Sequence, residues 1–140
     1  MKKRILNVLL SLLMAGTITF MTSNHIYADD QPYLMKAHAT AYCQSGTTAS
    51  GTQTRKGICA AKKEWIGKTI VIYQRLPGDK IGNMIGIYEC LDTGGTEGIK
   101  TGKVIDIWEP DLEGCQEFMN KVYEDGCKGK VYIQIVDAVG

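Results

Sequence analysis

The chain has 140 residues, of which 44% are hydrophobic and 22% charged, and its formal net charge is +1 at neutral pH. This composition is that of an ordinary globular domain and excludes collagen-like and low-complexity chains. The balanced charge provides no basic stripe to follow a phosphate backbone, so we expect no nucleic-acid partner.

The first 28 residues have the organisation of a secretory signal peptide. A basic head of Lys2, Lys3 and Arg4 precedes an apolar stretch, Ile5 to Phe20, and Ala28 supplies a small residue before a cleavage site. A membrane anchor is the alternative, but the stretch is short for a span of about 20 residues. We therefore predict cleavage after Ala28, no stable membrane insertion, and a secreted, extracellular or cell-wall-associated protein.

Removing 28 of the 140 residues leaves 112, which suits one domain with one modest core. This domain, residues 29–140, keeps all 15 acidic residues and loses three of the 16 basic ones, so its net charge is near −2. We expect it to be a monomer.

The domain alternates short predicted strands with turns. Alternating and β-branched residues predict strands over 34–43, 58–61, 65–75, 84–92, 103–108 and 130–138. In 65–75, Ile70 and Ile72 share one face, and the Pro-Gly and Gly-Asn pairs in 76–83 predict a turn.

One helix is predicted over 111–123, where apolar residues recur at intervals of three and four and Asp111 can act as the N-cap. Six short strands with one short helix before the last favour a mainly β fold. A small closed barrel is favoured over an open sheet, because a closed barrel leaves no exposed edge strands.

The chain has five cysteines, at positions 43, 59, 90, 115 and 127. In an exported protein an odd number leaves at least one thiol free or paired between chains. Cys115 with Cys127 and Cys43 with Cys59 are candidate bridges, but the sequence does not fix the connectivity. No close-set pair of metal ligands is present, so we expect no metal site and no cofactor.

The segment 92–108, DTGGTEGIKTGKVIDIW, places one carboxylate at a glycine-rich turn and another inside a strand. With alternating strand geometry, Ile105 and Ile107 face the core, while Asp106 faces outward on the side of Trp108. Asp92 begins the turn, whose glycines permit a tight backbone. If the two carboxyls share a groove, mutual repulsion or burial favours a protonated form that can act as an acid.

A plain structural interpretation is the alternative: Asp92 caps a turn and Asp106 is an exposed strand residue. The residue pattern alone favours this interpretation, since aspartate is common in turns and strongly perturbed acids are rare.

Several motifs together resemble the three-aspartate (3D) domain of exported bacterial proteins. They are ATAYC (39–43), TASGT (48–52), GICAAKKEWIGKTIVIY (57–73), DTGG (92–95), GIK (98–100) and VIDIW (104–108), and they cover nearly all of the predicted domain. The family is related to the C-terminal catalytic domain of A-type membrane-bound lytic transglycosylases. The resemblance implies a double-psi β-barrel with a groove for peptidoglycan glycan strands.

The resemblance also implies roles for individual residues. Asp106 matches the catalytic acid/base and Asp92 its supporting carboxylate. Thr48, Ser50 and Gly51 match a loop beside the groove, and we expect Gly94, Lys100 and Trp108 to complete the substrate-binding residues. The reaction implied is cleavage of the β-1,4 bond between N-acetylmuramic acid and N-acetylglucosamine, with a 1,6-anhydro product.

Two departures from the family bear on activity. The first family aspartate is missing from the Ala60–Ala61–Lys62 region, where Lys62 is the nearest ionisable residue, and the spacing from Asp92 to Asp106 is longer than usual. A cation close to either aspartate would lower the pKa of that carboxyl and weaken a general acid.

Two other functions fit parts of the pattern. The same barrel can bind peptidoglycan without cutting it, which makes a non-catalytic wall-binding module the main alternative. LDTGG also resembles the aspartic-protease motif, but that chemistry needs two such carboxylates sharing a proton. The chain has one copy, so a protease would have to be a homodimer.

Overall fold

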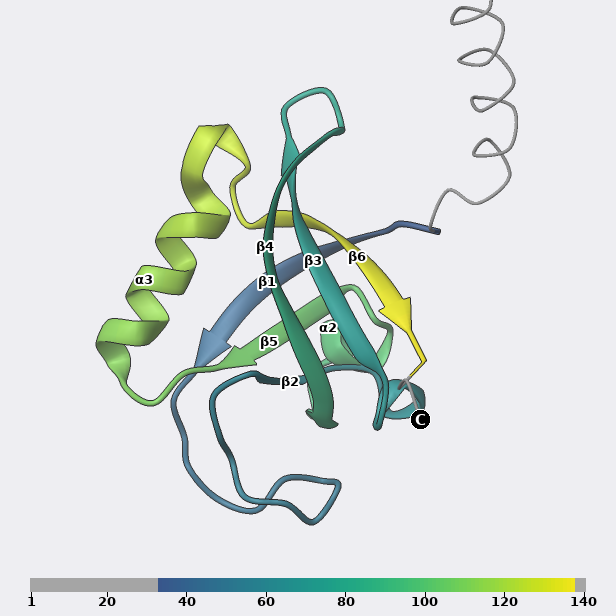
Figure 1. Ribbon diagram of the computed structural model, residues 1–140, viewed down its shortest axis with the longest axis vertical. Helices are drawn as coiled ribbons and strands as arrows, with labels where there is room; N and C mark the ends of the chain where they lie inside the picture. The colour runs from purple at the N-terminus through teal and green to yellow at the C-terminus, as the bar shows by residue number, and fades with distance from the viewer. Residues whose placement is uncertain (1–32, 138–140) are drawn as a thin grey trace, which may run out of the picture. The chain divides into compact units, whose positions relative to one another are not determined.

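Six strands close into a barrel in the computed structural model, which describes residues 33–137 (Figure 1). The strands are β1 (Met35–Tyr42), β2 (Ile58–Ala60), β3 (Thr69–Leu76), β4 (Lys80–Asp92), β5 (Val104–Trp108) and β6 (Lys130–Val136). The helices are α2 (Glu97–Lys100) and α3 (Leu112–Tyr123), with short 3-10 helices η1 (Lys63–Trp65) and η2 (Glu124–Gly126). The predicted signal peptide lies outside the described residues.

The barrel has two parallel strand pairs. Around its circumference the order is β1-β5-β2-β4-β3-β6; β1–β5 and β2–β4 are parallel, and the other four pairs are antiparallel. The two halves of the chain are equivalent in this arrangement. If β1, β2 and β3 are exchanged with β4, β5 and β6, respectively, every strand keeps the same neighbours and every pair keeps its direction. The prediction of a small six-stranded barrel, with one short helix before the last strand, is confirmed.

Alternation along the strands fills the barrel interior. Ile105 and Ile107 of β5 and Ile70 and Ile72 of β3 are all 0% exposed, whereas Asp106 between the first two is half-buried. The predicted division of β5 into a core face and a second face is therefore confirmed, because successive strand side chains point to opposite sides.

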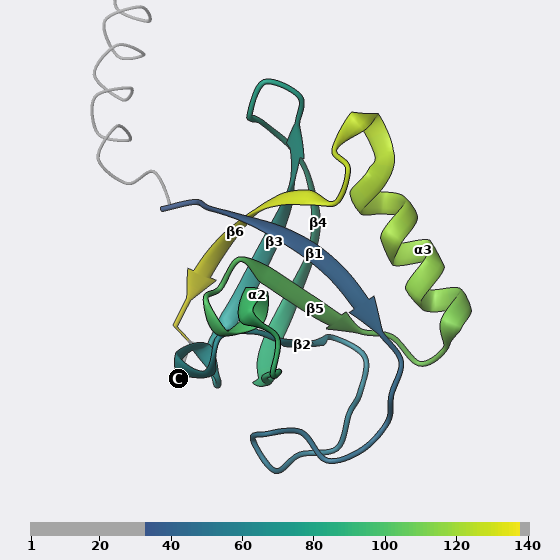
Figure 2. The same ribbon diagram turned by 180° about the vertical axis from the view of Figure 1, so that it is seen from behind.

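Helix α3 begins at the predicted N-cap and lies along one side of the barrel (Figure 2). The Oδ1 atom of Asp111 accepts a 2.8 Å hydrogen bond from the Gly114 backbone N–H, which satisfies a free donor of the first turn. The buried residues Cys115, Phe118 and Val122 follow the predicted three- and four-residue spacing. The Phe118 ring meets Tyr88 of β4 edge-on, with ring centroids 6.3 Å apart.

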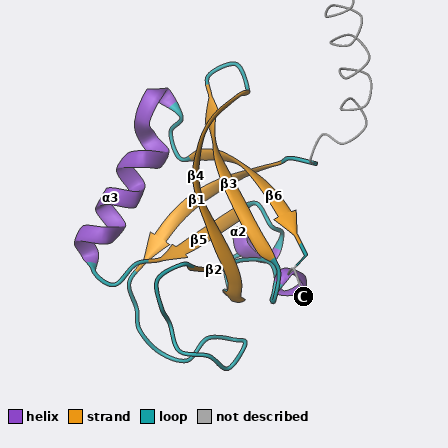
Figure 3. Ribbon diagram, in the orientation of Figure 1, coloured by secondary structure: helices purple, strands orange, loops and turns teal. Residues whose placement is uncertain are grey.

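The β1–β2 connection, residues 43–57, is a long loop at one end of the barrel, and the β3–β4 turn lies at the opposite end (Figure 3). This loop contains the predicted TASGT motif. No helix among the described residues is both long and apolar enough to span a membrane.

Two element boundaries differ from the prediction. The strand expected to begin at Trp65 begins at Thr69, because η1 and a left-handed Gly67 (φ 90°) precede it. Strand β4 begins at Lys80 rather than 84, since the turn after Leu76 is shorter than expected. The four-residue helix α2 was not predicted; its sequence is too short to show a helical period.

Replacement of Ile107 by alanine tests the core assignment. We expect Ile107→Ala to lower the free energy of unfolding by about 2–5 kcal/mol, because it deletes buried methyl groups and leaves a cavity. Ile87→Ala is the matched control, since Ile87 is 58% exposed. Chemical denaturation measures both, and equal losses in the two variants would contradict the assignment.

Candidate functional site

Strand β2 lies between the two strands that carry the candidate aspartates. Ala60, its last residue, is the register partner of Asp92 on β4 and also of Asp106 on β5. Neighbouring strands are about 4.8 Å apart, so the backbones at the two aspartates are roughly 10 Å apart across one small residue. The fold therefore brings together two carboxylates that are fourteen positions apart in the sequence.

Asp106 is a half-buried acid with one hydrogen bond. The Thr40 hydroxyl, on the parallel neighbour β1, donates to its Oδ1 atom at 2.7 Å. Burial raises the pKa of Asp106, and the negative charge of Asp92 raises it further, while the Thr40 hydrogen bond acts in the opposite direction. Among the described residues no hydrogen bond reaches Oδ2, so this atom is free to meet a ligand.

Asp92 holds three segments together at the end of β4. Its Oδ1 atom accepts hydrogen bonds of 2.9 Å from the backbone N–H groups of Ala49 and Thr93. Its Oδ2 atom accepts a 3.2 Å bond from the Tyr42 hydroxyl. Asp92 thus fixes the 43–57 loop and the end of β1 next to the DTGG turn.

Tyr42 links the two aspartates electrostatically. Burial raises the pKa of its hydroxyl, and the charge of Asp92, the hydrogen bond to Asp92 and the charge of Asp106 raise it further. A hydroxyl in this position stays protonated and keeps donating to Asp92. The Tyr42 hydroxyl therefore positions the Asp92 carboxylate.

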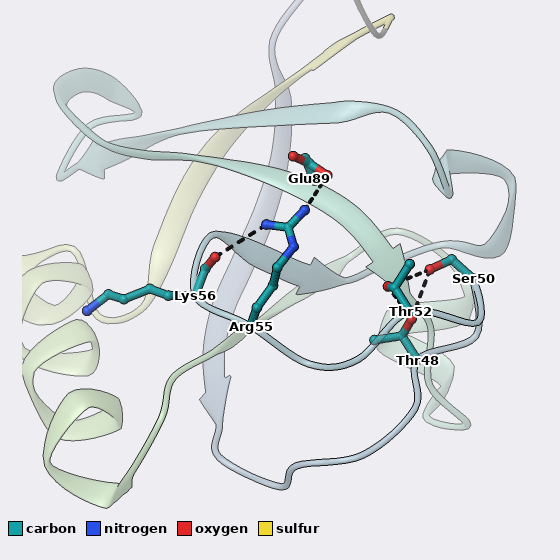
Figure 4. A network of polar contacts seen from close by, with 6 residues as sticks. All are labelled: Thr48, Ser50, Thr52, Arg55, Lys56 and Glu89. Atoms are coloured by element: carbon teal, nitrogen blue, oxygen red, sulfur yellow. Dashed lines mark hydrogen bonds and ion pairs between the residues drawn. The ribbon is translucent and has the colours of Figure 1, made fainter.

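Three hydroxyl groups of the 43–57 loop form a closed hydrogen-bonded cluster (Figure 4). The Thr48 Oγ1 atom lies 2.8 Å from Ser50 Oγ and 3.0 Å from Thr52 Oγ1, and the latter two atoms are 3.1 Å apart. Thr48 is buried, and Gly51 adopts the left-handed conformation, with φ of 87°, that closes the turn. The backbone N–H of Ser50 donates to Leu91 O at 3.0 Å, which ties the cluster to β4.

A shallow pocket of about 200 Å³ adjoins this loop. It is lined by Tyr42, Gln44, Ser45, Gly46, Thr47, Thr54 and Asp92. Backbone and hydroxyl groups dominate the lining, and of the two aspartates only Asp92 belongs to it.

The remaining predicted binding residues take different positions. Lys100 is exposed in the last turn of α2. Gly94 is half-buried, and an added Cβ would lie 2.8 Å from Ile99 Cδ1, so the glycine permits the turn to pack closely on α2. Trp108 is only 7% exposed, and its indole N–H donates to Gln44 O at 3.1 Å. Its ring therefore packs beneath the loop and presents little surface for stacking on a sugar.

The position at which the family resemblance leads us to expect another aspartate lies beside this pair. Ala60 carries no ionisable group, Ala61 is 0% exposed, and Lys62 follows directly after them. Burial is the main cause of the raised pKa of Asp106, and the negative charge of Asp92 adds to it, whereas a nearby cation would lower it.

The sequence did not predict that Thr40 and Tyr42 would hydrogen-bond the two aspartates. Both lie on β1, and they reach the aspartates because β1 pairs in parallel with β5, with Thr40 opposite Asp106 and Tyr42 opposite Trp108. The polar side chains that alternate with Ala37 and Ala39 are the signal that this strand presents a functional face.

Comparison with known proteins gives a single structural likeness. No protein family matches the chain, and no curated protein is significantly similar to it. Among solved structures it is similar to the Streptomyces papain inhibitor (SPI), with 15% sequence identity and a TM-score of 0.49. The alignment covers 74% of this chain and 94% of that chain. At this level no function is transferred, and the resemblance to the three-aspartate family rests on the sequence motifs.

The pair of substitutions Thr40→Val and Asp92→Asn should move the pKa of Asp106 in opposite directions. Loss of the Thr40 hydroxyl removes a donor to the carboxylate and raises the pKa, whereas loss of the Asp92 charge lowers it. NMR titration of the Asp106 side-chain carbon measures both shifts. Thr96→Val is the control, since Thr96 is exposed and its side chain makes no capping bond; a rise with Asp92→Asn would contradict the proposed repulsion.

The raised pKa of Asp106 also predicts a pH dependence of stability. The group is more readily protonated in the folded than in the unfolded chain, so its stabilising contribution is present below the ordinary aspartate pKa of about 3.9 and disappears as pH rises through the folded value. We expect the free energy of unfolding of Asp106→Asn to lack this part of its decrease with rising pH. Urea unfolding of both proteins across acidic pH measures the difference, and parallel curves would show that Asp106 titrates normally.

Proposed function

We propose that this protein is an exported peptidoglycan lytic transglycosylase in which Asp106 is the acid/base. The observation that supports this most directly is a half-buried carboxyl of raised pKa, with one free oxygen atom, held near a second carboxylate. Such a carboxyl retains its proton to higher pH and can deliver it to a leaving oxygen atom.

The reaction uses one carboxyl for two proton transfers. Protonated Asp106 gives its proton to the oxygen atom of the β-1,4 bond between N-acetylmuramic acid and N-acetylglucosamine. The resulting carboxylate then takes a proton from the C6 hydroxyl of the muramic acid, which attacks C1 and forms the 1,6-anhydro ring. Hydrolases with two catalytic carboxylates differ, because their second carboxylate acts as the nucleophile or activates water.

The neighbouring residues tune and orient this group. Thr40 fixes Oδ1 of Asp106, which directs Oδ2 toward the substrate, and the charge of Asp92 favours the protonated acid. Asp92 also anchors the 43–57 loop, which lines the polar pocket beside Asp92 through Ser45, Thr47 and Thr54. Thr48, Ser50 and Gly51 hold the shape of that loop through their own hydrogen bonds. Gly94 and Lys100 border the same end of the barrel through the DTGG turn and α2.

We place this activity outside the cytoplasm, in a monomer that acts on glycan strands of the cell wall. The basic head and apolar stretch of the first 28 residues support export. The described barrel carries both aspartates on one chain, so a single copy suffices for the proposed chemistry.

A non-catalytic peptidoglycan-binding module is the second candidate. Lys62 is the ionisable residue nearest to the position of the missing first family aspartate, and Trp108 is buried rather than open to a sugar ring. A barrel that has the polar pocket but lacks one of the family's carboxylates can bind glycan without cleaving it.

Replacement of Asp106 by asparagine tests the catalytic proposal. Asparagine keeps the shape and removes the titratable proton, so we expect release of anhydro-muropeptides from purified sacculi to fall by about 10²- to 10⁴-fold. Mass spectrometry of the soluble products measures the loss. Glu113→Gln, an exposed carboxyl on α3, is the matched control and should retain full activity.

The same experiment separates the two candidate functions. If Asp106 is the acid, product release also falls as pH rises through its pKa. Wild-type protein that sediments with sacculi without releasing anhydro-muropeptides at any pH would instead identify a binding module. Equal release by wild type and Asp106→Asn would remove Asp106 from the mechanism.

A further inference from the structure

Two buried cysteines lie side by side directly beneath the candidate aspartates. Cys59 on β2 and Cys90 on β4 are register partners in a parallel pair, and both are 0% exposed. Adjacent strands are about 4.8 Å apart, which falls within the Cα separation of roughly 4.4–6.8 Å that a disulfide spans. Register partners on adjacent strands project their side chains to the same face of the sheet, and both side chains here belong to the hydrophobic core.

The surroundings of these thiols favour a structural disulfide over reaction with a ligand or binding of a metal ion. Both belong to the hydrophobic core cluster and are sealed from solvent. Within residues 33–137 no group of three or more histidine, cysteine or acidic side chains is placed to hold a metal ion. The Cys90 thiol also makes a weak contact from its Sγ to Asp92 O at 3.7 Å.

The pair sits next to the point where the barrel becomes irregular. The register between β2 and β4 shifts between Cys59 and Ala60, so that Ala60 pairs with Asp92 and Leu91 is the extra residue. Ala60 is also the partner of Asp106. A covalent bond at the preceding position would fix β2 against β4 immediately before the site, and with it the separation of the two carboxylates.

A second pair is formed by Cys43 and Cys115. Cys43 directly follows Tyr42, the last residue of β1, whose carbonyl accepts a 2.9 Å hydrogen bond from the Glu109 N–H. Cys115 lies in the first turn of α3, a few residues after Glu109. Cys127 lies after η2 and is buried at 1% exposure. The pairs suggested by proximity in the sequence, Cys43–Cys59 and Cys115–Cys127, are therefore not those that the fold brings together.

We propose that the exported protein carries two disulfides, Cys59–Cys90 beneath the aspartates and Cys43–Cys115 between the end of β1 and α3, with Cys127 left as a buried thiol. This proposal rests on the expected export, since disulfides persist in oxidising compartments. For each bond two thiols lose two protons and two electrons and form one S–S bond. The electrons reduce the disulfide of an oxidised thiol oxidoreductase, or of oxidised glutathione in vitro, to two thiols.

Mapping the bonds is the first test. The full chain is produced by export or refolded with oxidised and reduced glutathione, alkylated without reduction, digested and analysed by mass spectrometry. We expect peptides linked through Cys59–Cys90 and through Cys43–Cys115, an intact mass lower by four hydrogen atoms, and one alkylated residue, Cys127. Five alkylated cysteines, or a bond between Cys115 and Cys127, would overturn the proposal.

Stability in reductant isolates the bond beneath the site. In a Cys43→Ser/Cys115→Ser background only Cys59–Cys90 can form, and we expect reductant to lower Tm by about 10 °C, the usual scale for losing one disulfide in a domain of this size. When Cys59→Ala and Cys90→Ala are added to this background, reductant should no longer change Tm, whatever the absolute Tm of the fourfold variant. Cys127→Ala in the same background controls for loss of a buried cysteine and should keep the shift.

An unchanged Tm in reductant for the Cys43→Ser/Cys115→Ser protein would exclude a bond between Cys59 and Cys90. If the fourfold variant does not fold, the mapped peptides still decide the pairing. Neither readout involves glycan cleavage, so the disulfides stand or fall separately from the proposed transglycosylase activity.

Discussion

The candidate site depends on the placement of β2, a strand of three residues held between β4 and β5. All three of its residues are buried, and its last residue is the register partner of both aspartates. No turn or helix brings Asp92 and Asp106 together; their separation is set by strand pairing on the two sides of Ala60. Any side chain larger than a methyl group at this position would come between the carboxylates.

The two carboxylates play different parts because their surroundings differ. Asp92 has both oxygen atoms occupied by donors from three segments, so its contribution is structural as well as electrostatic. Asp106 has a single donor and a half-buried position, which leaves it with the raised pKa that acid chemistry needs. The same residue type is thus a hydrogen-bonded anchor in one strand and a half-buried acid of raised pKa in the next but one.

Local patterns in the sequence were enough to predict the strands and α3. The alternation of Ile105, Asp106 and Ile107 identifies a core face without further information, and Asp111 followed by a helical spacing locates the start of α3. These signals are local, because they depend on neighbours within a few positions. The boundaries near Gly67 and the helix α2 were missed, since a single left-handed residue or a four-residue helix leaves no period to read.

Contacts between distant segments could not be predicted in this way. Thr40 donates to Asp106 only because β1 and β5 run in parallel in one particular register, and nothing in either strand specifies that register. The cysteine pairs have the same origin, as Cys59 meets Cys90 through the parallel pairing of β2 with β4. Trp108 was expected on an open face, but the 43–57 loop covers it.

The equivalence of the two halves of the barrel has a consequence for the origin of the site. Strand β2 in the first half corresponds to β5 in the second, so Ala60 and Asp106 face each other across matching strands. A barrel assembled from two identical halves would present the same chemical group twice at this crossing. The two halves depart from such a duplication, because Ala60 presents a methyl group on one side of this crossing and Asp106 presents a half-buried acid on the other.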